Sequence, residues 1–230
     1  MLARAALLSV SLIMVATLGM AKPDREAGVA AATAPVELRI ATLHAAALTL
    51  PNGGRDSVDT PYLLVSVFGP RTKSHALTLP AEGHWRVHRD EALGARALET
   101  LRLGDGDSVR VLVTVMEGGR ADRSAEERAA SEAASEPAAN ARERSHIVGA
   151  AVEPLVSGGA RWIGSASLLL TREAGISYWR GLDCVTSCKV VSGAASASLS
   201  AGNATAPSGV IELSGGGATY HLKLEAREPR

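Results

Sequence analysis

Alternation of apolar and polar residues with a period of two recurs along this 230-residue chain. Between residues 109 and 115, valines alternate with Arg110, Leu112 and Thr114, and residues 36–41 and 220–225 alternate in the same way. Successive side chains of a β-strand point to opposite faces, so this pattern predicts strands with one face in a core. Each run is expected to be a half-buried antiparallel strand.

Further apolar runs are predicted to be strands because clusters of Gly, Pro, Asp and Ser bound them. These runs are residues 62–69, 98–103, 147–152, 162–170 and 209–213. About eight short strands with turn chemistry between them are typical of a β-sandwich. We therefore expect an all-β fold, an antiparallel β-sandwich that occupies residues 36–227 as a single domain.

Residues 1–21 are predicted to be a secretory signal peptide. Arg4 supplies a positive start, and residues 5–19 form an apolar core that small residues follow. This core is shorter than the roughly twenty residues that a spanning helix needs, so no transmembrane segment is expected after cleavage. Residues 22–35 would form a flexible leader, and the mature protein is expected to be soluble and secreted or periplasmic.

Composition and motifs narrow the function classes. The 24 Lys and Arg residues balance the 24 Asp and Glu residues, so there is no overall electrostatic case for nucleic acid as a partner. The sequence contains no GxSxG elbow and no GxxxxGK[ST] phosphate loop. The absence of these enzyme motifs favours a binding or structural module over an enzyme.

Residues 120–145 interrupt the strand pattern, because they are rich in Ala, Glu and Arg and contain no large apolar side chain. Ser124 and Glu127 have the spacing of a capping box, and Pro137 is expected to end a helix near Glu136. One interpretation is a surface insertion that is helical in its first half and mobile in its second. The alternative is a lid or partner-docking helix, which would need an apolar stripe.

Cys184 and Cys188 are the two cysteines of the chain. They lie in residues 181–207, a stretch rich in Ser, Gly and Ala that is expected to form a long loop or a weak edge hairpin. An even pair in an exported protein most often forms a disulfide, which here would shape a turn locally. The alternatives are a redox pair, which normally has two intervening residues, and half of a metal site, which would need further ligands nearby.

Two other groups of residues are candidate metal ligands by residue type. His84 and His88 flank Trp85, but on a strand they would stand about 13 Å apart, too far for one metal ion. Asp105 and Asp107 lie in a Gly-rich turn that runs straight into valines, whereas a helix-loop-helix calcium loop would continue with more oxygen ligands. We expect surface or rim histidines and a hairpin turn.

The stretch VELRIATLHAAALTLPNGGRDSVDTPYLLVSVFG, residues 36–69, resembles a known β-sandwich family. It looks like the first strand, first loop and second strand of the calcium- and lipid-binding domains of protein kinase C and synaptotagmin. That family has a Ser-Asp-Pro-Tyr step into the second strand, where this chain has Val58-Asp59-Thr60-Pro61-Tyr62. The stretch DSVRVLVTVMEGG, residues 107–119, resembles the strand that leads into the family's third loop.

The resemblance implies a calcium site between the first and third loops, with Asp56, Asp59 and Glu117 as candidate ligands. The third loop of the family brings an Asp-x-Asp pair, whereas this chain has one carboxylate, Glu117, followed by two glycines. Asp122 is a further carboxylate nearby. Calcium takes roughly six to eight oxygen ligands, so carbonyl groups and water would have to complete the set. No other cofactor is expected.

Three functions fit these observations. The first is an exported, non-enzymatic module that binds a protein partner, a glycan or a lipid surface through its end loops, with His84 and Trp85 at the rim of the ligand site. The second is a small secreted hydrolase in which dispersed carboxylates, such as Asp59 and Glu117, converge in space. The third is a structural or inhibitor-like domain with no small ligand.

Overall fold

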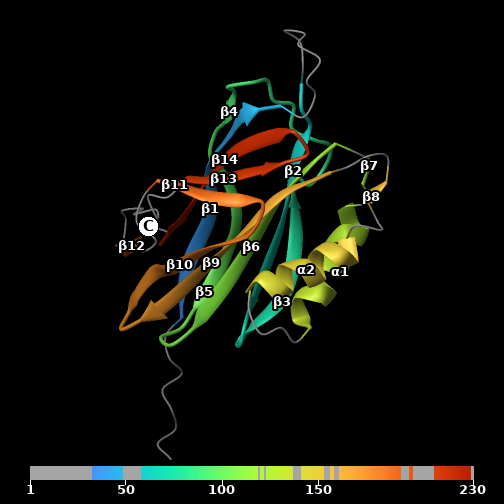
Figure 1. Cartoon of the computed structure of the whole chain (residues 1–230). Coiled ribbons are helices and arrows are strands. Elements are labelled where there is room, and N and C mark those ends of the chain that lie inside the picture. The colour runs from blue at the N-terminus through green and yellow to red at the C-terminus, as the bar shows by residue number, and fades with distance from the viewer. Residues whose placement is uncertain are drawn as a thin grey trace, which may run out of the picture. The chain divides into compact units, whose positions relative to one another are not determined.

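The computed structural model describes residues 33–48, 58–118, 120–121, 123–136, 141–152, 156–157, 161–192, 197–198 and 210–228. All of them belong to one compact unit, Ala31–Arg230. The predicted signal peptide and most of the predicted leader lie outside the described residues. Most of the described residues form antiparallel strands in two large sheets (Figure 1), so the predicted all-β sandwich is confirmed.

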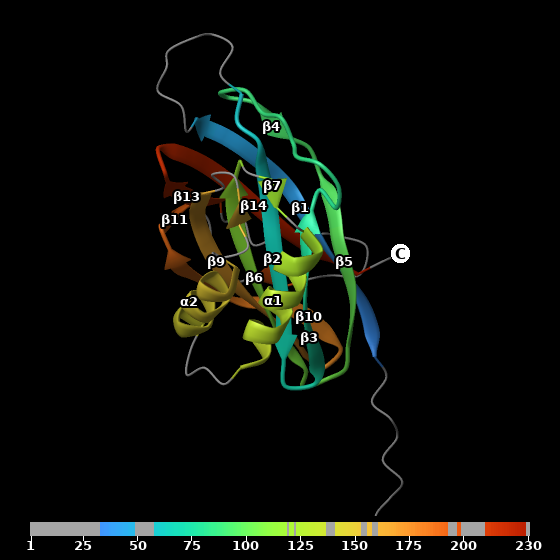
Figure 2. The same ribbon diagram turned by 90° about the vertical axis from the view of Figure 1, so that its right-hand side faces the viewer.

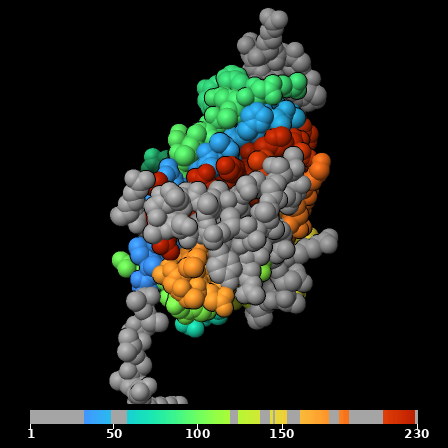
Figure 3. Space-filling model, turned by 90° about the vertical axis from the view of Figure 1, so that its left-hand side faces the viewer, coloured from blue at the N-terminus to red at the C-terminus, as the bar shows by residue number. Residues whose placement is uncertain are grey.

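The first sheet, called the β1 sheet below, contains β1 (Ala34–Ala47), β4 (Ala92–Leu93), β5 (Arg96–Leu103), β11 (Cys188–Ser192), β13 (Val210–Gly215) and β14 (Ala218–Arg227). Its strand order is β11-β13-β14-β1-β4, and β5 also pairs with β1. Figure 3 shows β4 in green, β1 in blue and β14 in red, side by side in that order. β1 begins at Ala34, two residues before the predicted boundary, because Ala34 and Pro35 pair with the end of β5.

The second sheet, called the β2 sheet below, contains β2 (Pro61–Gly69), β3 (Thr72–Leu79), β6 (Ser108–Glu117), β9 (Arg161–Glu173), β10 (Ile176–Thr186) and β12 (Ala197–Ser198). Its strand order is β12-β10-β9-β6-β2-β3. Two short strands, β7 (Arg120–Ala121) and β8 (Val156–Ser157), pair with each other in a separate ribbon.

The main core fills the space between the two sheets. Alternate residues of each strand point into it, as the period-two pattern predicted. In β6 these are the valines at 109, 111, 113 and 115, and in β14 they include Tyr220, Leu222 and Leu224. Both sets are buried, so the alternation identified the inward faces of these two strands correctly.

Two helices cover the outer face of the β2 sheet (Figures 1 and 2), and both come from the region of the predicted insertion. They are α1 (Arg123–Ser135) and α2 (Ala141–Val152). A second apolar cluster joins Leu64, Phe68 and Leu112 of the sheet to alanines of α1 and valines of α2. Every residue from Pro61 to Phe68 is therefore buried, because β2 has apolar contacts on both of its faces.

Three expectations about this region were wrong. Residues 147–152 were expected to form a strand, but they form the second half of α2, where Val148 and Val152 pack on the sheet. The second half of the insertion was expected to be mobile, yet α2 begins at Ala141. Alanines were judged a poor apolar stripe, whereas Ala130, Ala133 and Ala134 of α1 are buried against the sheet.

Helix α1 also bonds to the edge strand β3, which the sequence analysis did not identify. Ser131 Oγ accepts a hydrogen bond from the Ala76 backbone N–H at 2.6 Å, and Glu127 Oε1 accepts one from the Thr78 N–H at 2.6 Å. Glu127 was predicted to act in a capping box, but this carboxylate binds the strand instead. An unpaired sheet edge invites association with other chains, and α1 protects this part of the edge.

The turn with Asp105 and Asp107 links the two sheets. The Gly104 N–H donates to Asp107 Oδ2 at 2.7 Å, and Gly106 has a φ of 82°, so the expected turn chemistry is present. The predicted hairpin is wrong, however, because β5 belongs to the β1 sheet and β6 to the β2 sheet. The chain crosses from one layer of the sandwich to the other at this turn.

Candidate functional site

Asp59 lies just before β2 and is buried, with 1 % of its surface exposed. Its backbone forms an isolated bridge with Val87, in which each N–H donates to the other residue's carbonyl at 3.0 Å. Its carboxylate accepts a hydrogen bond from the Tyr220 hydroxyl at 2.8 Å. Tyr220 lies on β14, so this bond connects the two sheets at the end of the sandwich where β2 begins.

Glu117, at the end of β6, lies close to the same tyrosine. It pairs with Pro61 across the ladder between β6 and β2, and it is 9 % exposed. Burial is the main cause that raises the pKa of Tyr220, and the negative charges of Asp59 and Glu117 raise it further. The phenol of Tyr220 therefore stays protonated and donates to Asp59, and Glu117 acts on it through its charge.

A second tyrosine pairs with a carboxylate beside this cluster. Tyr62 is fully buried on β2 and donates a hydrogen bond to Glu126 Oε1 of α1 at 3.0 Å. The ring of exposed His84 meets the edge of the Tyr62 ring, with 6.1 Å between centroids. Tyr62 thus links α1 to the segment that carries the predicted rim residues.

These contacts bear on the predicted calcium site. Asp59 precedes β2 and contacts the phenol of Tyr220, Glu117 ends β6 and acts on the same phenol through its charge, and Asp56 lies outside the described residues. Within the described part of the chain, no group of three or more His, Cys, Asp or Glu side chains could hold a metal ion. Calcium binding stays a prediction, and the role that the geometry gives Asp59 is to anchor Tyr220.

The same geometry bears on the hydrolase alternative. That alternative required its two named carboxylates, Asp59 and Glu117, to converge in a groove, and both act on the buried Tyr220 through their negative charges. A general acid or base must come within hydrogen-bonding distance of a substrate. Asp59 is almost completely buried and is bonded to Tyr220, so its carboxylate contacts the interior of the sandwich rather than the solvent.

The segment that contains the predicted rim residues follows β3, and its side chains alternate between exposed and buried positions. His84, Arg86 and His88 are exposed, whereas Trp85 between them is half-buried and Val87 is buried. Trp85 packs against the main core, so its side chain anchors the segment to the sandwich. The exposed basic side chains therefore point outward at alternate positions, and we call His84, Arg86 and His88 the basic row.

The basic row is fixed to the sandwich on both sides. Val87 is held by its backbone bridge to Asp59, and the Asp90 N–H donates to the Ala45 carbonyl at 2.8 Å. The Ala45 N–H in turn donates to the Glu91 carbonyl at 3.0 Å. The sequence analysis named His84 and Trp85 as rim residues but missed Arg86, which the alternation from His84 to His88 could have identified.

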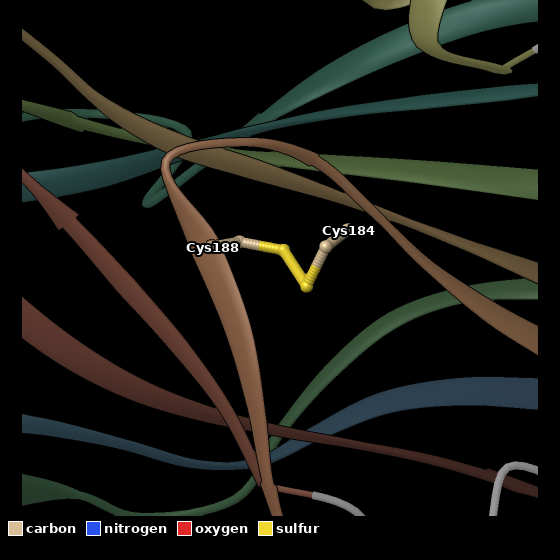
Figure 4. Close-up of a disulfide and its surroundings, with 2 residues drawn as sticks. All are labelled: Cys184 and Cys188. Carbon is tan, nitrogen blue, oxygen red and sulfur yellow. A yellow bond between two sulfur atoms is a disulfide. The ribbon is translucent and has the colours of Figure 1, made fainter.

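The predicted disulfide is present between Cys184 and Cys188, with the sulfur atoms 2.19 Å apart (Figure 4). β10 ends at Thr186 in the β2 sheet, and β11 begins at Cys188 in the β1 sheet. The bridge thus closes the tight corner at which the chain changes sheets. The Ser214 N–H donates to the Ser187 carbonyl at 2.8 Å and holds the same corner from β13.

No helix in the described residues has the length and apolar character needed to cross a membrane.

Comparisons with known proteins add no family to this description. No family model matches the chain, and no curated protein or solved structure is significantly similar to it. The resemblance to calcium- and lipid-binding domains therefore stays a prediction, and the function must be inferred from the residues of the chain itself.

Proposed function

We propose that this protein is an exported, non-enzymatic β-sandwich module that binds an acidic glycan through the basic row. The observation that carries the proposal is the outward row of His84, Arg86 and His88 on a segment fixed to the sandwich. A glycan is one of the partner classes expected for the end loops, and cationic side chains recognise its acidic groups.

The spacing of the row supports a linear ligand. Alternate residues of an extended strand lie about 7 Å apart on one face, so three basic side chains extend over about 13 Å. A chain of linked sugars with regularly placed acidic groups can contact all of them at once, whereas a single small anion contacts one or two. Arg86 is the central member, and its guanidinium can bond a carboxylate or sulfate with two N–H groups.

The rigidity of the segment also supports binding. Hydrogen bonds to Asp59 and Ala45 hold its backbone, and Trp85 packs beneath it. A surface that is already ordered loses less conformational entropy when a ligand binds. The buried pair of Asp59 and Tyr220 therefore contributes to binding as a support for the row, without touching the ligand.

The charges around the row are of both signs. Glu82 and Asp90 are exposed beside it, and the Glu91 carboxylate accepts a hydrogen bond from the His88 backbone N–H at 2.7 Å. Arg89 is a further exposed cation directly after the row. Arg86 and Arg89 stay positively charged, so their attraction to an acidic glycan should weaken as the salt concentration rises.

The experiment is a binding titration with polygalacturonate, an acidic glycan, and with dextran as the neutral polymer, at low and at high salt. Polygalacturonate is expected to bind, and to bind less tightly at higher salt. The variant Arg86→Gln should weaken binding about tenfold, the usual effect of losing a charged hydrogen bond. Arg102→Gln, which changes an exposed arginine of β5, is the matched control.

Three outcomes would overturn the proposal. One is equal binding of dextran and polygalacturonate, and another is equal loss of binding in the Arg86 and Arg102 variants. The third is binding to phosphatidylserine vesicles but not to polygalacturonate, which would move the partner class from glycan to lipid. Repeating the titration with calcium chloride and with a chelator tests the separate calcium prediction, since a bound ion near Asp59 would change the affinity or the melting temperature.

A further inference from the structure

A cavity of about 370 Å³ lies between the helices and the outer face of the β2 sheet, on a different part of the domain from the basic row. β2, β6 and β9 supply one wall, which includes Phe68 and Leu169. The other wall comes from the end of α1 at Ser135 and from Arg144 of α2. The volume falls in the range of small-molecule sites, roughly 300–1,000 Å³.

Arg144 is held in a defined position in this cavity. Its guanidinium lies over the Phe68 ring, with the central carbon 4.7 Å from the ring centroid. The same group donates a hydrogen bond to the Ala134 carbonyl near the end of α1. A cation over an aromatic face is stabilised by the ring quadrupole. These contacts fix the direction of the side chain before any ligand arrives.

Arg110 reaches the same cavity from β6. Its guanidinium donates a hydrogen bond to Ser167 Oγ on β9 at 3.1 Å, among other contacts. Because a guanidinium has five N–H donors, it can bond several acceptors at the same time. The described lining residues include these two arginines and no carboxylate, and the serines Ser74, Ser108 and Ser135 add hydroxyl groups. The lining therefore combines positive charge, hydroxyl donors and an apolar wall.

We propose that this cavity binds a small organic anion, with an oxyanion group between Arg110 and Arg144 and an apolar body against Phe68 and Leu169. The arginines supply charge-assisted hydrogen bonds to the oxyanion, and the hydroxyls of Ser74 and Ser108 can donate to its other lone pairs, whereas the Ser135 hydroxyl donates to the Ser131 carbonyl. The apolar wall distinguishes an organic anion from an inorganic one, because burial of its body adds affinity. This site is independent of the proposed glycan surface.

The test is calorimetric titration of the full mature chain with four probes of related shape. Benzoate and phenyl phosphate carry an apolar ring with an oxyanion, benzamide is the neutral counterpart of benzoate, and inorganic phosphate lacks the ring. Binding of both aromatic anions is expected, at least tenfold tighter than binding of benzamide and of inorganic phosphate. Benzoate and phenyl phosphate together distinguish carboxylate from phosphate as the preferred group.

Two variants locate the site. Arg144→Gln and Arg110→Lys should each weaken benzoate binding about tenfold or more, because each loses charge or fork geometry at the oxyanion. Arg128→Gln, on the exposed side of α1, is the matched control and should bind as the parent does. Circular dichroism tests whether each variant is folded. If a variant does not fold, the site is located in the parent protein instead, where benzoate should shift the backbone amide signals of Gly69 and Ser108.

The proposal is overturned if no aromatic anion binds, if benzamide binds as well as benzoate, or if the arginine variants bind as the parent does. It is also overturned if the amide shifts caused by benzoate occur at the basic row and not around Gly69 and Ser108. If Arg86→Gln loses polygalacturonate binding but keeps benzoate binding, the glycan surface and the cavity are independent sites. Either proposal can then be rejected without rejecting the other.

Discussion

The two sheets of the sandwich differ in what covers their outer faces. Helices α1 and α2 pack on the β2 sheet, and β2 is buried from Pro61 to Phe68. On β14 of the β1 sheet, buried and half-exposed residues alternate along the whole strand, with His221, Lys223 and Glu225 among the half-exposed ones. No helix in the described residues packs on that side.

The difference shows that a continuous apolar run marks a strand that is covered on both faces. An alternating run marks one buried face only, and β6 shows that the other face of such a strand can be covered too, since Leu112 and Thr114 are buried. A strand with one buried face needs apolar residues only at every second position. When helices cover the second face as well, the run becomes continuous, as in PYLLVSVFG. The second apolar layer, which includes Leu64 and Phe68, exists because the Ala-rich insertion folds back onto the sheet.

The largest expected effect tests this second layer directly. Leu64→Ala removes a fully buried side chain between β2 and the helices, and it should lower the free energy of unfolding by about 2–5 kcal/mol. Lys223→Ala, on the outer face of β14, should change it by no more than about 0.5 kcal/mol. Urea unfolding of both variants with linear extrapolation measures the two values. Similar losses would mean that the helices do not bury this face.

The inward faces of the alternating strands could be predicted from sequence, and the inward valines of β6 and the inward residues of β14 were both predicted correctly. The expected half-buried state holds for β14. It was wrong for residues 109–115 of β6, because Leu112 and Thr114 on the other face are buried as well. Residues 147–152 could not be assigned, since a short apolar run fits a buried strand and a buried helix equally well. β3 was missed because its sequence, TKSHALTL, contains many polar residues. These residues are tolerated because β3 is an edge strand that contacts α1 and the solvent.

The candidate site was predicted only in part, and for a physical reason. The loops that carry Asp59 and Glu117 were expected to meet at one end of the sandwich. Asp59 bonds to Tyr220, and the charge of Glu117 acts on the same residue. That residue, Tyr220, lies 161 positions from Asp59 in the sequence, so no local spacing could indicate the contact. The pattern also could not show that the hydrogen bond turns Asp59 toward the interior.

A middle-sized effect concerns the edge of the covered sheet. Removing the Glu127 carboxylate with Glu127→Ala leaves the buried Thr78 N–H without its acceptor, which should cost about 1–3 kcal/mol of unfolding free energy. Glu132→Ala, exposed on the same helix, is the control and should have little effect. Because an unprotected edge favours strand pairing, the double variant Glu127→Ala, Ser131→Ala should also self-associate in sedimentation experiments. A monomeric double variant of unchanged stability would show that α1 does not protect β3.

The smallest expected effect tests a contact between the β1 sheet and the β2 sheet, where β5 of the first lies near β3 of the second. His75 of β3 and Glu99 of β5 belong to different sheets, and His75 Nε2 lies 2.8 Å from both carboxylate oxygens. Burial lowers the pKa of His75, but the hydrogen bond to the Lys73 carbonyl and the interaction with Glu99 together raise it above its usual 6.5. The charged form is therefore favoured in the folded state.

A raised histidine pKa fixes the direction of the pH dependence. The stabilisation is fully present below the pKa of the unfolded chain, about 6.5, and is lost as the pH rises through the higher pKa of the folded protein. His75 is partly exposed, so the whole effect should stay within about 1 kcal/mol. His75→Gln should flatten this part of the profile of unfolding free energy against pH, whereas His146→Gln, an exposed histidine of α2, should leave it unchanged. Stability that rises over the same interval in the parent would mean that the two sheets are not joined by a charged His75.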